Sequence, residues 1–447
     1  MKRNLTQGSV FKNLVFFSLP YLLSYFLQTL YGMADLFIVG QYNTVAATTA
    51  VSVGSQVMHM LTVMIVGLAM GSTVSIGQAI GGNDSKGASK STGNTAALFM
   101  VLSLIITALL IALVKPIVSV MSTPKAAVAD TVKYLTICFA GIPFITAYNI
   151  ISSVFRGIGD SKSPMYFIAV ACAANIMLDY LFIGAMHLGA AGAALGTVIS
   201  QALSVAVSLA VIIKRDIGVR LCKSDFYPDR NVLGKILKIG LPICLQDGLI
   251  QIAFIVITVI ANRRGLTDAA AVGIVEKIIG FLFLVPSSLL SAVSALSAQN
   301  IGANKPRRAV LTLRYAIITA VIFGIAVSVT AQFTAEYAVG LFTSDKDVAA
   351  AGGQYLRGYI FDCIFAGIHF SFSGYFCAMG KSLISFIHNI TAIAAVRIPG
   401  VYLASKLYPS TMLPMGLATA AGSLLSVIIC VIAFAVIQKR ESRKNFG

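Results

Sequence analysis

Long apolar runs are the feature that most constrains what this chain can fold into. Each is about 20 residues or longer and can cross a hydrocarbon core of about 30 Å. There are twelve, near 13–38, 47–78, 92–114, 128–154, 164–184, 190–213, 239–261, 270–298, 310–334, 349–375, 382–405 and 414–437. Lipid offers no hydrogen bonds to an open backbone, so we expect helices. The alternation of polar and apolar residues that a β-barrel needs is missing.

The low charge content argues against a soluble protein. Only 11% of the 447 residues are charged, 57% are hydrophobic, and the mean hydropathy is +0.88. A soluble domain carries about 25% charged residues. We therefore predict an all-α polytopic membrane protein with twelve transmembrane helices, whose main partner is the lipid bilayer.

The net charge of +17 follows the topology of the chain. If the N-terminus is inside, 23 of the 33 Lys and Arg residues fall in inner segments, eight fall in outer segments, and Lys277 and Arg397 lie within spans. Basic residues concentrate on the cytoplasmic side of membrane proteins. We therefore expect a multi-pass protein of the cytoplasmic membrane with both termini in the cytoplasm, and no nucleic-acid partner.

The chain repeats itself once, at an offset near 221. The stretch "GQAIGGN" at 77–83 corresponds to "AQNIGAN" at 298–304, and "FRGIGDS" at 155–161 corresponds to "FCAMGKS" at 376–382. Each half holds six spans, an even number, so both halves enter the membrane from the same side. Parallel repeats of this kind occur in secondary transporters, with the binding site near the midplane between the halves.

The predicted organisation is two six-helix lobes joined by a polar cytoplasmic linker. The N-terminal lobe, the linker, and the C-terminal lobe with its short cytoplasmic tail cover residues 1–214, 215–238 and 239–447. No nucleotide-binding motif is visible, because "GKS" at 380–382 has Tyr375 where a phosphate loop needs its first glycine. We expect no organic cofactor, and an ion gradient as the energy source for any uphill transport.

Five acidic residues fall inside spans and are the first candidates for function. A carboxylate at bilayer depth costs a few kcal/mol, so each must face the interior of the helix bundle. The alternative for each is a structural role, as a neutral or paired acid that ties helices together. The five are Asp35, Asp179, Asp247, Glu276 and Asp362.

Polar residues lie near Asp179 in the sequence. Asn175 lies four residues earlier and therefore shares its helix face, and Thr197 follows in the next span. With Asp35 these side chains would form an oxygen-rich cluster suited to Na⁺ or to a proton held between two acids. Span order alone does not bring Asp35 next to Asp179, so their contact is a hypothesis.

The C-terminal half carries both acids and bases inside its spans. Glu276 and Lys277 are adjacent and do not share a helix face. Lys277 and Arg397 are candidate partners of Asp247 and Asp362, which favours structural pairing over transport work. The intramembrane histidines His59, His369 and His388 have no metal-binding spacing, and we expect them to be hydrogen-bonded packing residues.

Several motifs together resemble the multidrug and toxic compound extrusion (MATE) family. They are "YGMADLFIVGQ" at 31–41, "FRGIGDSKSP" at 155–164, "NIMLDYLFIGAMHLGAAGAALGTVISQ" at 175–201 and "AQNIGANKPRRA" at 298–309. The resemblance is to bacterial and archaeal members with an ion site in the N-terminal lobe. It implies that a cation or proton binds at Asp35, Asn175, Asp179 and Thr197, with Na⁺ as one candidate, that Tyr134 belongs to the same network, and that the first span bends at Pro20.

In the C-terminal lobe, this sequence departs from the pattern of another branch of the family. That branch has a Na⁺ site with a Glu in the seventh span and an Asp in the tenth. Here Asp247 and Asp362 lie about one helical turn before those positions. We expect these two acids, with Glu276, to line the cavity of the C-terminal lobe.

The function that the resemblance implies is secondary active efflux. The expected protein is a monomer, is not an enzyme, and exports organic and often cationic drug-like compounds in exchange for H⁺ or Na⁺ by alternating access. The alternative is a lipid-linked saccharide flippase of the same wider superfamily, although flippases carry strongly basic cavities and this chain has only Lys277 and Arg397 inside spans. A membrane enzyme or channel is disfavoured because no nucleophile–base pair or metal cluster is visible.

Overall fold

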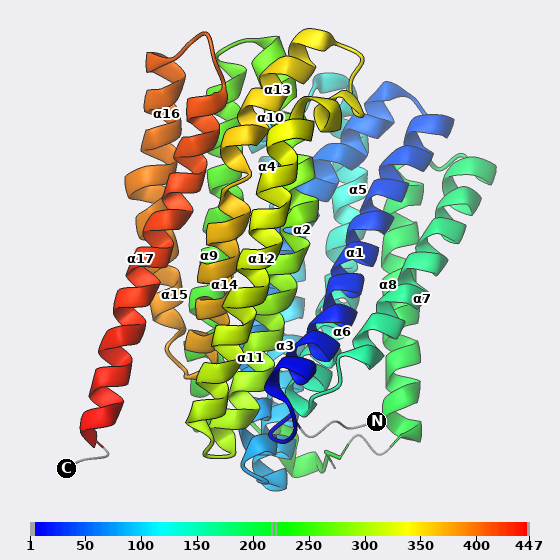
Figure 1. Ribbon diagram of the computed structural model, residues 1–447. Coiled ribbons are helices and arrows are strands. Elements are labelled where there is room, and N and C mark those ends of the chain that lie inside the picture. The colour runs from blue at the N-terminus through cyan, green and yellow to red at the C-terminus, as the bar shows by residue number, and fades with distance from the viewer. Residues whose placement is uncertain (1–4, 216–217, 220, 445–447) are drawn as a thin grey trace. The chain divides into compact units, whose positions relative to one another are not determined.

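The computed structural model describes residues 5–215, 218–219 and 221–444, and within these ranges it contains helices and no strands (Figure 1). Lys2, Arg3 and Arg220, three of the basic residues assigned above to inner segments, lie outside the described residues. So do parts of the expected lobe, linker and tail ranges, namely residues 1–4, 216–217 and 445–447.

The first half of the chain consists of helices that lie mostly in the apolar runs. They are α1 (Val10–Tyr42), α2 (Val45–Gly81), α3 (Ser85–Ala112), α4 (Val114–Val120), η1 (Lys125–Ala127), α5 (Val128–Ala140), α6 (Ile142–Ile158), α7 (Lys162–Asp179), η2 (Tyr180–Ala185), α8 (Gly189–Lys214) and η3 (Lys223–Phe226).

The second half follows the same plan. Its helices are α9 (Arg230–Asn262), α10 (Leu266–Leu282), α11 (Leu284–Gly302), α12 (Pro306–Gly340), α13 (Lys346–Tyr359), α14 (Asp362–Ala378), α15 (Ser382–Ala392), η4 (Ile393–Arg397), α16 (Ile398–Leu407) and α17 (Leu413–Lys444). Here η2 and η4 are π-helical turns, whereas η1 and η3 are 3-10 turns.

The predicted membrane architecture is confirmed. Ten helical segments in the described residues are long and apolar enough to span a membrane, and two bent pairs bring the total to 12 if each pair is one span. The bends, of 46° and 41°, separate α5 from α6 and α13 from α14. The chain is thus an all-α, multi-pass membrane protein with two halves of six spans.

Several helices are longer than the apolar runs that predict them. α3 begins at Ser85 because the Asp84 side chain caps it, accepting a 2.8 Å hydrogen bond from the Gly87 amide. α9 already begins at Arg230, inside the range expected for the linker. Hydropathy reports only the apolar part of a helix, so it misses these polar ends.

The turns of the two halves match one another. Asn83 and Asn304 both adopt left-handed backbone conformations, with φ of 56° and 55°. Gly159 and Gly380 do the same after the "FRGIG" and "FCAMG" stretches, with φ of 96° and 70°. Each pair is separated by the repeat offset of 221 residues, so the duplication extends to turn conformation.

The described chain forms two compact units. Both include pieces of α1, α9 and α11, so these helices are shared, and the lobe boundaries given above stay a prediction. Unit 1 comprises 1–7, 19–244 and 298–304, and unit 2 comprises 8–18, 245–297 and 305–447.

Within each unit, long helices pack closely. In unit 1, α2 packs on α6 while α8 contacts both α5 and α7. In unit 2, α12 packs on α14, and α13 packs on α17 where Gly358 and Gly416 let the two backbones approach closely.

The start of α9 and the turn before it are fixed to α3. The Asn94 side chain donates to the carbonyl groups of Asp225 (2.9 Å) and Tyr227 (3.2 Å) and accepts from the Asp229 amide (2.7 Å). Lys90 forms an ion pair with Asp229. This part of the linker is therefore an ordered element of unit 1.

Candidate cation site

Asp35 and Thr197 meet although 162 positions separate them in the sequence. Thr197 on α8 donates a hydrogen bond of 3.2 Å to Asp35 Oδ2 on α1. The Asp35 side chain is buried, with 4% of its surface exposed, and Thr197 is half-buried. A carboxyl group from the first span is thus held inside the N-terminal helices by the sixth span.

Asp179 and Asn175 complete the cluster from the end of α7. Both are buried, and both are side-chain neighbours of Asp35. Asp179 is the last residue of α7, directly before the π-helical turn η2, which ends the regular α-helical hydrogen bonding. Such turns occur often at functional sites. The structure therefore brings the four residues Asp35, Asn175, Asp179 and Thr197 together.

Gly196 makes room for the Asp179 carboxyl group. A side-chain carbon at position 196 would overlap Asp179 Oδ1 and would lie 3.6 Å from Asn175 Nδ2. The missing side chain lets α8 pack directly against the two polar residues of α7. Sequence reasoning identified the "GAALGT" stretch but did not identify this role of its second glycine.

Several polar atoms of the cluster have no partner in the described part of the chain. Among the described residues, no hydrogen bond reaches Asp35 Oδ1, either Asp179 oxygen, or the Asn175 amide group, and no basic side chain forms an ion pair with either carboxyl group. Buried polar atoms in native proteins are nearly always paired. Carboxyl and amide oxygens with open lone pairs can hold a proton or a hard cation.

Aromatic and thiol groups border the site. Tyr31 on α1 and Tyr134 on α5 both lie within electrostatic range of Asp35. Tyr134 is buried, and its ring packs against Gly54 of α2. Tyr134 was predicted from the sequence, whereas Tyr31 and the Tyr134 neighbour Cys138 were not.

Pro20 lies inside α1, which continues through it as one helix from Val10 to Tyr42. The Pro20 carbonyl accepts a hydrogen bond of 2.8 Å from the Ser24 hydroxyl. Beyond Pro20, helices α1, α2 and α6 and Pro164 enclose a polar cavity of about 20 Å³, lined by Tyr21, Ser24, Tyr25, Gln28, Val66, Tyr148, Asn149, Ser152, Arg156 and Pro164.

This cavity is much smaller than a drug. Sites for drug-sized ligands have volumes of roughly 300–1,000 Å³, whereas the cavity has the volume needed for about one water molecule. It contains a buried cation, because 5% of Arg156 is exposed and its guanidinium lies 5.8 Å from the Tyr21 ring.

The three candidate acids of the C-terminal half have different surroundings. Asp362 is paired with Arg397, whose Nη2 lies 2.8 Å from Asp362 Oδ2. Thr258 lies 3.4 Å from each Glu276 oxygen, and Asp247 is half-buried beside Gln246. Of the two suggested basic partners, Arg397 pairs with Asp362, while Lys277 is exposed and forms no ion pair among the described residues.

His388 is a hydrogen-bonded packing residue, as expected. Its ring nitrogens contact the hydroxyls of Ser373 at 3.0 Å and Ser426 at 3.2 Å. The His369 ring lies 5.5 Å from the His388 ring, centroid to centroid. The residues that the structure describes contain no group of three or more His, Cys, Asp or Glu side chains arranged to hold a metal ion.

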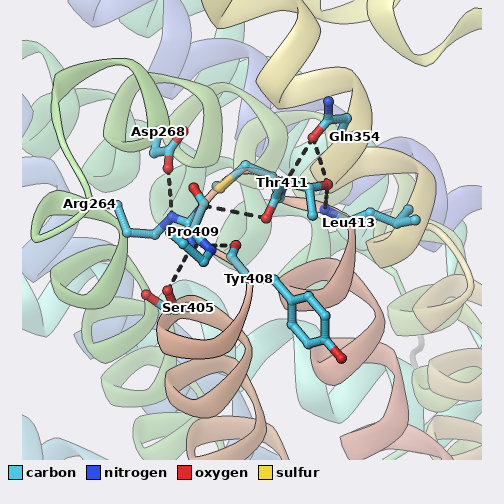
Figure 2. Close-up of polar contacts among 9 residues, drawn as sticks. Arg264, Asp268, Gln354, Ser405, Tyr408, Pro409, Thr411 and Leu413 are labelled. Atoms are coloured by element: carbon cyan, nitrogen blue, oxygen red, sulfur yellow. Dashed lines mark hydrogen bonds and ion pairs between the residues drawn. The ribbon is translucent and has the colours of Figure 1, made fainter.

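Arg264 organises one end of the C-terminal half (Figure 2). Its guanidinium forms an ion pair of 2.6 Å with Asp268 and donates to the carbonyl groups of Ser405 (2.9 Å) and Pro409 (2.9 Å). Gln354 on α13 holds the same loop by accepting from the Thr411 hydroxyl at 2.9 Å. The sequence marked Arg264 only as a loop charge.

Comparison with known proteins identifies a family. The MatE family model matches twice, over residues 20–181 and 242–403, in agreement with the internal duplication. "Probable multidrug resistance protein YpnP" of Bacillus subtilis (strain 168) is 30% identical over 394 residues, 88% of each chain. "Multidrug export protein MepA" of Staphylococcus aureus (strain NCTC 8325 / PS 47) is 26% identical over 410 residues, 91% of this chain and 89% of MepA.

Solved structures share the fold. A MATE structure in complex with MaL6 has 23% identity and a TM-score of 0.88, covering 99% of both chains. A structure described as MATE in the bent conformation has 23% identity and a TM-score of 0.90, covering 98% of this chain and 97% of the other. At this identity the likeness is one of fold.

Proposed function

Because the chain belongs to the MatE family of membrane transporters, we propose that it exports organic, often cationic compounds in exchange for H⁺ or Na⁺. The family and the names of its relatives place it among multidrug efflux transporters. The observation that carries the finer proposal is the buried pair Asp35 and Asp179, whose open oxygens have no basic partner among the described residues.

Charge balance explains why this pair should bind a cation. An unpaired carboxylate in an apolar interior is costly, and the cost is removed if the carboxylate binds a proton or a metal cation. Asn175 and Thr197 add a neutral carbonyl and a hydroxyl oxygen, which a Na⁺ ion accepts as ligands. We propose that the cluster binds either a proton shared between the two acids or one Na⁺.

Coupling follows if the cation and the drug bind preferentially to different states. We propose that drug binds from the cytoplasm, that the carrier then opens outward, and that a cation entering from outside occupies Asp35 and Asp179 and weakens drug binding. By linkage, the drug must weaken cation binding by the same factor. The small polar cavity beside α1 must widen to admit a drug, and the Pro20 segment, which lacks one backbone hydrogen bond, is the proposed place for α1 to bend.

The proposed setting is the cytoplasmic membrane, with both termini in the cytoplasm and the transporter acting as a monomer. The orientation is supported by the concentration of Lys and Arg in the segments assigned to the inside. Asp247 and Glu276, half-buried in the C-terminal half, are proposed to line its cavity.

Ethidium efflux from membrane vesicles, with pH and Na⁺ gradients imposed separately, tests the proposal and identifies the coupling ion. We expect one gradient to drive efflux. Asp35→Asn and Asp179→Asn should each reduce driven efflux to the background of vesicles without the protein, because an amide cannot carry the charge that the cation neutralises. Asp347→Asn changes an exposed residue in the first turn of α13; it is the matched control and should transport normally. Full driven efflux by both site variants would refute the proposed ion site.

A further inference from the structure

The C-terminal half contains a charged centre in which the cation is part of the protein. Arg397 Nη2 donates to Asp362 Oδ2 at 2.8 Å and to the Ser423 hydroxyl at 2.9 Å. The Asp362 side chain is fully buried and that of Arg397 is 9% exposed. Of the ion pairs in the described part of the chain, this is the most deeply buried.

The helices hold Arg397 much as they hold Asp179 in the other half. Arg397 is the last residue of the π-helical turn η4 in the eleventh span, and Asp179 directly precedes the π-helical turn η2 in the fifth. Gly422 on α17 lies against Arg397, because a side-chain carbon there would lie 2.8 Å from Arg397 Cβ. On α8, Gly196 also lies against a charged residue, although there the contact is with the carboxyl oxygen of Asp179.

A hydroxyl follows the glycine in both halves. Thr197, after Gly196, donates to the Asp35 carboxyl group, and Ser423, after Gly422, accepts from Arg397. Each half therefore combines a carboxyl group, a charged residue of its fifth span, and a glycine–hydroxyl pair of its sixth span. The difference is chemical. The N-terminal centre has two acids and no basic partner among the described residues, whereas the C-terminal centre has one acid and one guanidinium.

We infer that Arg397 is a tethered cation, occupying at Asp362 the place that the exchanged cation takes at Asp35 and Asp179. This inference rests on the function proposed above. Its consequence is that Asp362 is permanently neutralised and does not take part in cation exchange, so coupling is confined to the N-terminal half. Removing the Arg397 side chain should turn Asp362 into a site for a free cation of guanidinium shape.

Guanidinium binding by purified variants tests this inference without any transport. Arg397→Ala removes the tethered cation and leaves the carboxyl group. We expect low concentrations of guanidinium chloride to raise the melting temperature of this variant in a saturable way, since a ligand that binds only the folded state stabilises it. Choline chloride at equal ionic strength is the salt control. Wild type and the double variant Asp362→Asn/Arg397→Ala should show no such rise, and equal responses of all three proteins would overturn the inference.

A second arm uses the neutral pair Asp362→Asn/Arg397→Gln, because a buried ion pair can often be replaced as a unit although removing one partner alone destabilises the protein. Whatever its rate, ethidium efflux by this variant should keep the wild-type dependence on cation concentration. A lost or altered dependence would make Asp362 a coupling carboxylate and overturn the inference. Failure of both Arg397 variants to fold, with or without guanidinium, would also count against it. Failure of the proposed function appears differently, as wild-type efflux that neither gradient drives.

Discussion

At the scale of single residues, Gly196 determines how closely α8 approaches the Asp179 carboxyl group. Gly196→Ala should push the carboxyl group away from Asn175 and Asp35. Overpacking of this kind typically costs about 1–3 kcal/mol. Where the displaced carboxyl group loses that much affinity for the cation, the half-saturating cation concentration rises by roughly 5- to 150-fold. The measurement is ethidium efflux against cation concentration.

Gly32→Ala is the matched control, because it lies on α1, one turn before Asp35, and a side-chain carbon there would meet no atom within 4 Å. It should keep the wild-type half-saturating concentration. The role assigned to Gly196 would be wrong if both variants matched wild type, or if both were impaired equally.

Local spacing predicts part of the candidate site, and tertiary packing decides the rest. Asn175 and Asp179 are four residues apart on one helix, so their shared face could be predicted. Spacing could not predict the contact of Asp35 with Thr197, because no spacing rule relates the first span to the sixth, and only the family resemblance implied that the two residues share a site. The sequence offered Asp247 and Asp362 as partners of Arg397, and only the packing of α14 and η4 against α17 selects Asp362.

At the scale of elements, Arg264 links the start of α10 to the loop between α16 and α17 (Figure 2). Arg264→Ala would leave Asp268 without its partner and several loop carbonyl groups without a donor. The network is partly buried, and a hydrogen bond to a charged group is worth about 1.5–3 kcal/mol, so we expect a fall in the melting temperature of the purified protein. Arg263→Ala, an exposed neighbour, should leave it unchanged. Equal melting temperatures for the two variants would show that the network contributes little.

The contact between Asn94 of α3 and the turn before α9 gives a second prediction at the scale of elements. Asn94→Ala removes the side chain that holds Asp225, Tyr227 and Asp229. Trypsin should then cleave after Lys223 several-fold faster than in wild type, because the turn is released from α3. Asn231→Ala, whose side chain is exposed, should be cleaved at the wild-type rate. Unchanged cleavage in Asn94→Ala would show that other contacts hold the turn.

The docking of the 225–229 segment on α3 should depend on pH. The ion pair with Lys90 and hydrogen bonds from the Val232 and Asn231 amides lower the pKa of Asp229 below its ordinary value of 3.8. A lowered pKa means that the charged form is stabilised in the docked state, so docking is fully supported above that value and weakens as the pH falls through the lower, docked value. The protection of the 223–227 amides against hydrogen exchange, taken relative to their intrinsic exchange rate at each pH, should therefore fall only in strong acid, and a fall already near pH 6 would contradict this account.

The helical elements could be predicted well from hydropathy, and their ends could not. Apolar runs locate the part of each helix in lipid, whereas Asp84 starts α3 before its apolar run begins. The bends between α5 and α6 and between α13 and α14 divide single apolar runs, because hydropathy carries no information on helix direction.

At the scale of the whole molecule, the duplication gives two halves with similar backbones but different charged groups. Matching turns at Asn83 and Asn304 show that the backbone plan is repeated. The charged groups are not repeated, because a pair of acids stands in one half and an acid–guanidinium pair in the other. A coupling site in one half only is the functional expectation from this asymmetry.

A drug–cation antiport assay in proteoliposomes tests the central claim most directly, because it follows the cation and the drug together. Purified protein is reconstituted without any ion gradient, an ethidium gradient is imposed, and internal pH and Na⁺ are recorded. We predict that ethidium movement drives H⁺ or Na⁺ in the opposite direction, and that Asp35→Asn abolishes this cation movement. Ethidium transport by the wild type without movement of either cation, or undiminished cation movement in Asp35→Asn, would contradict the account.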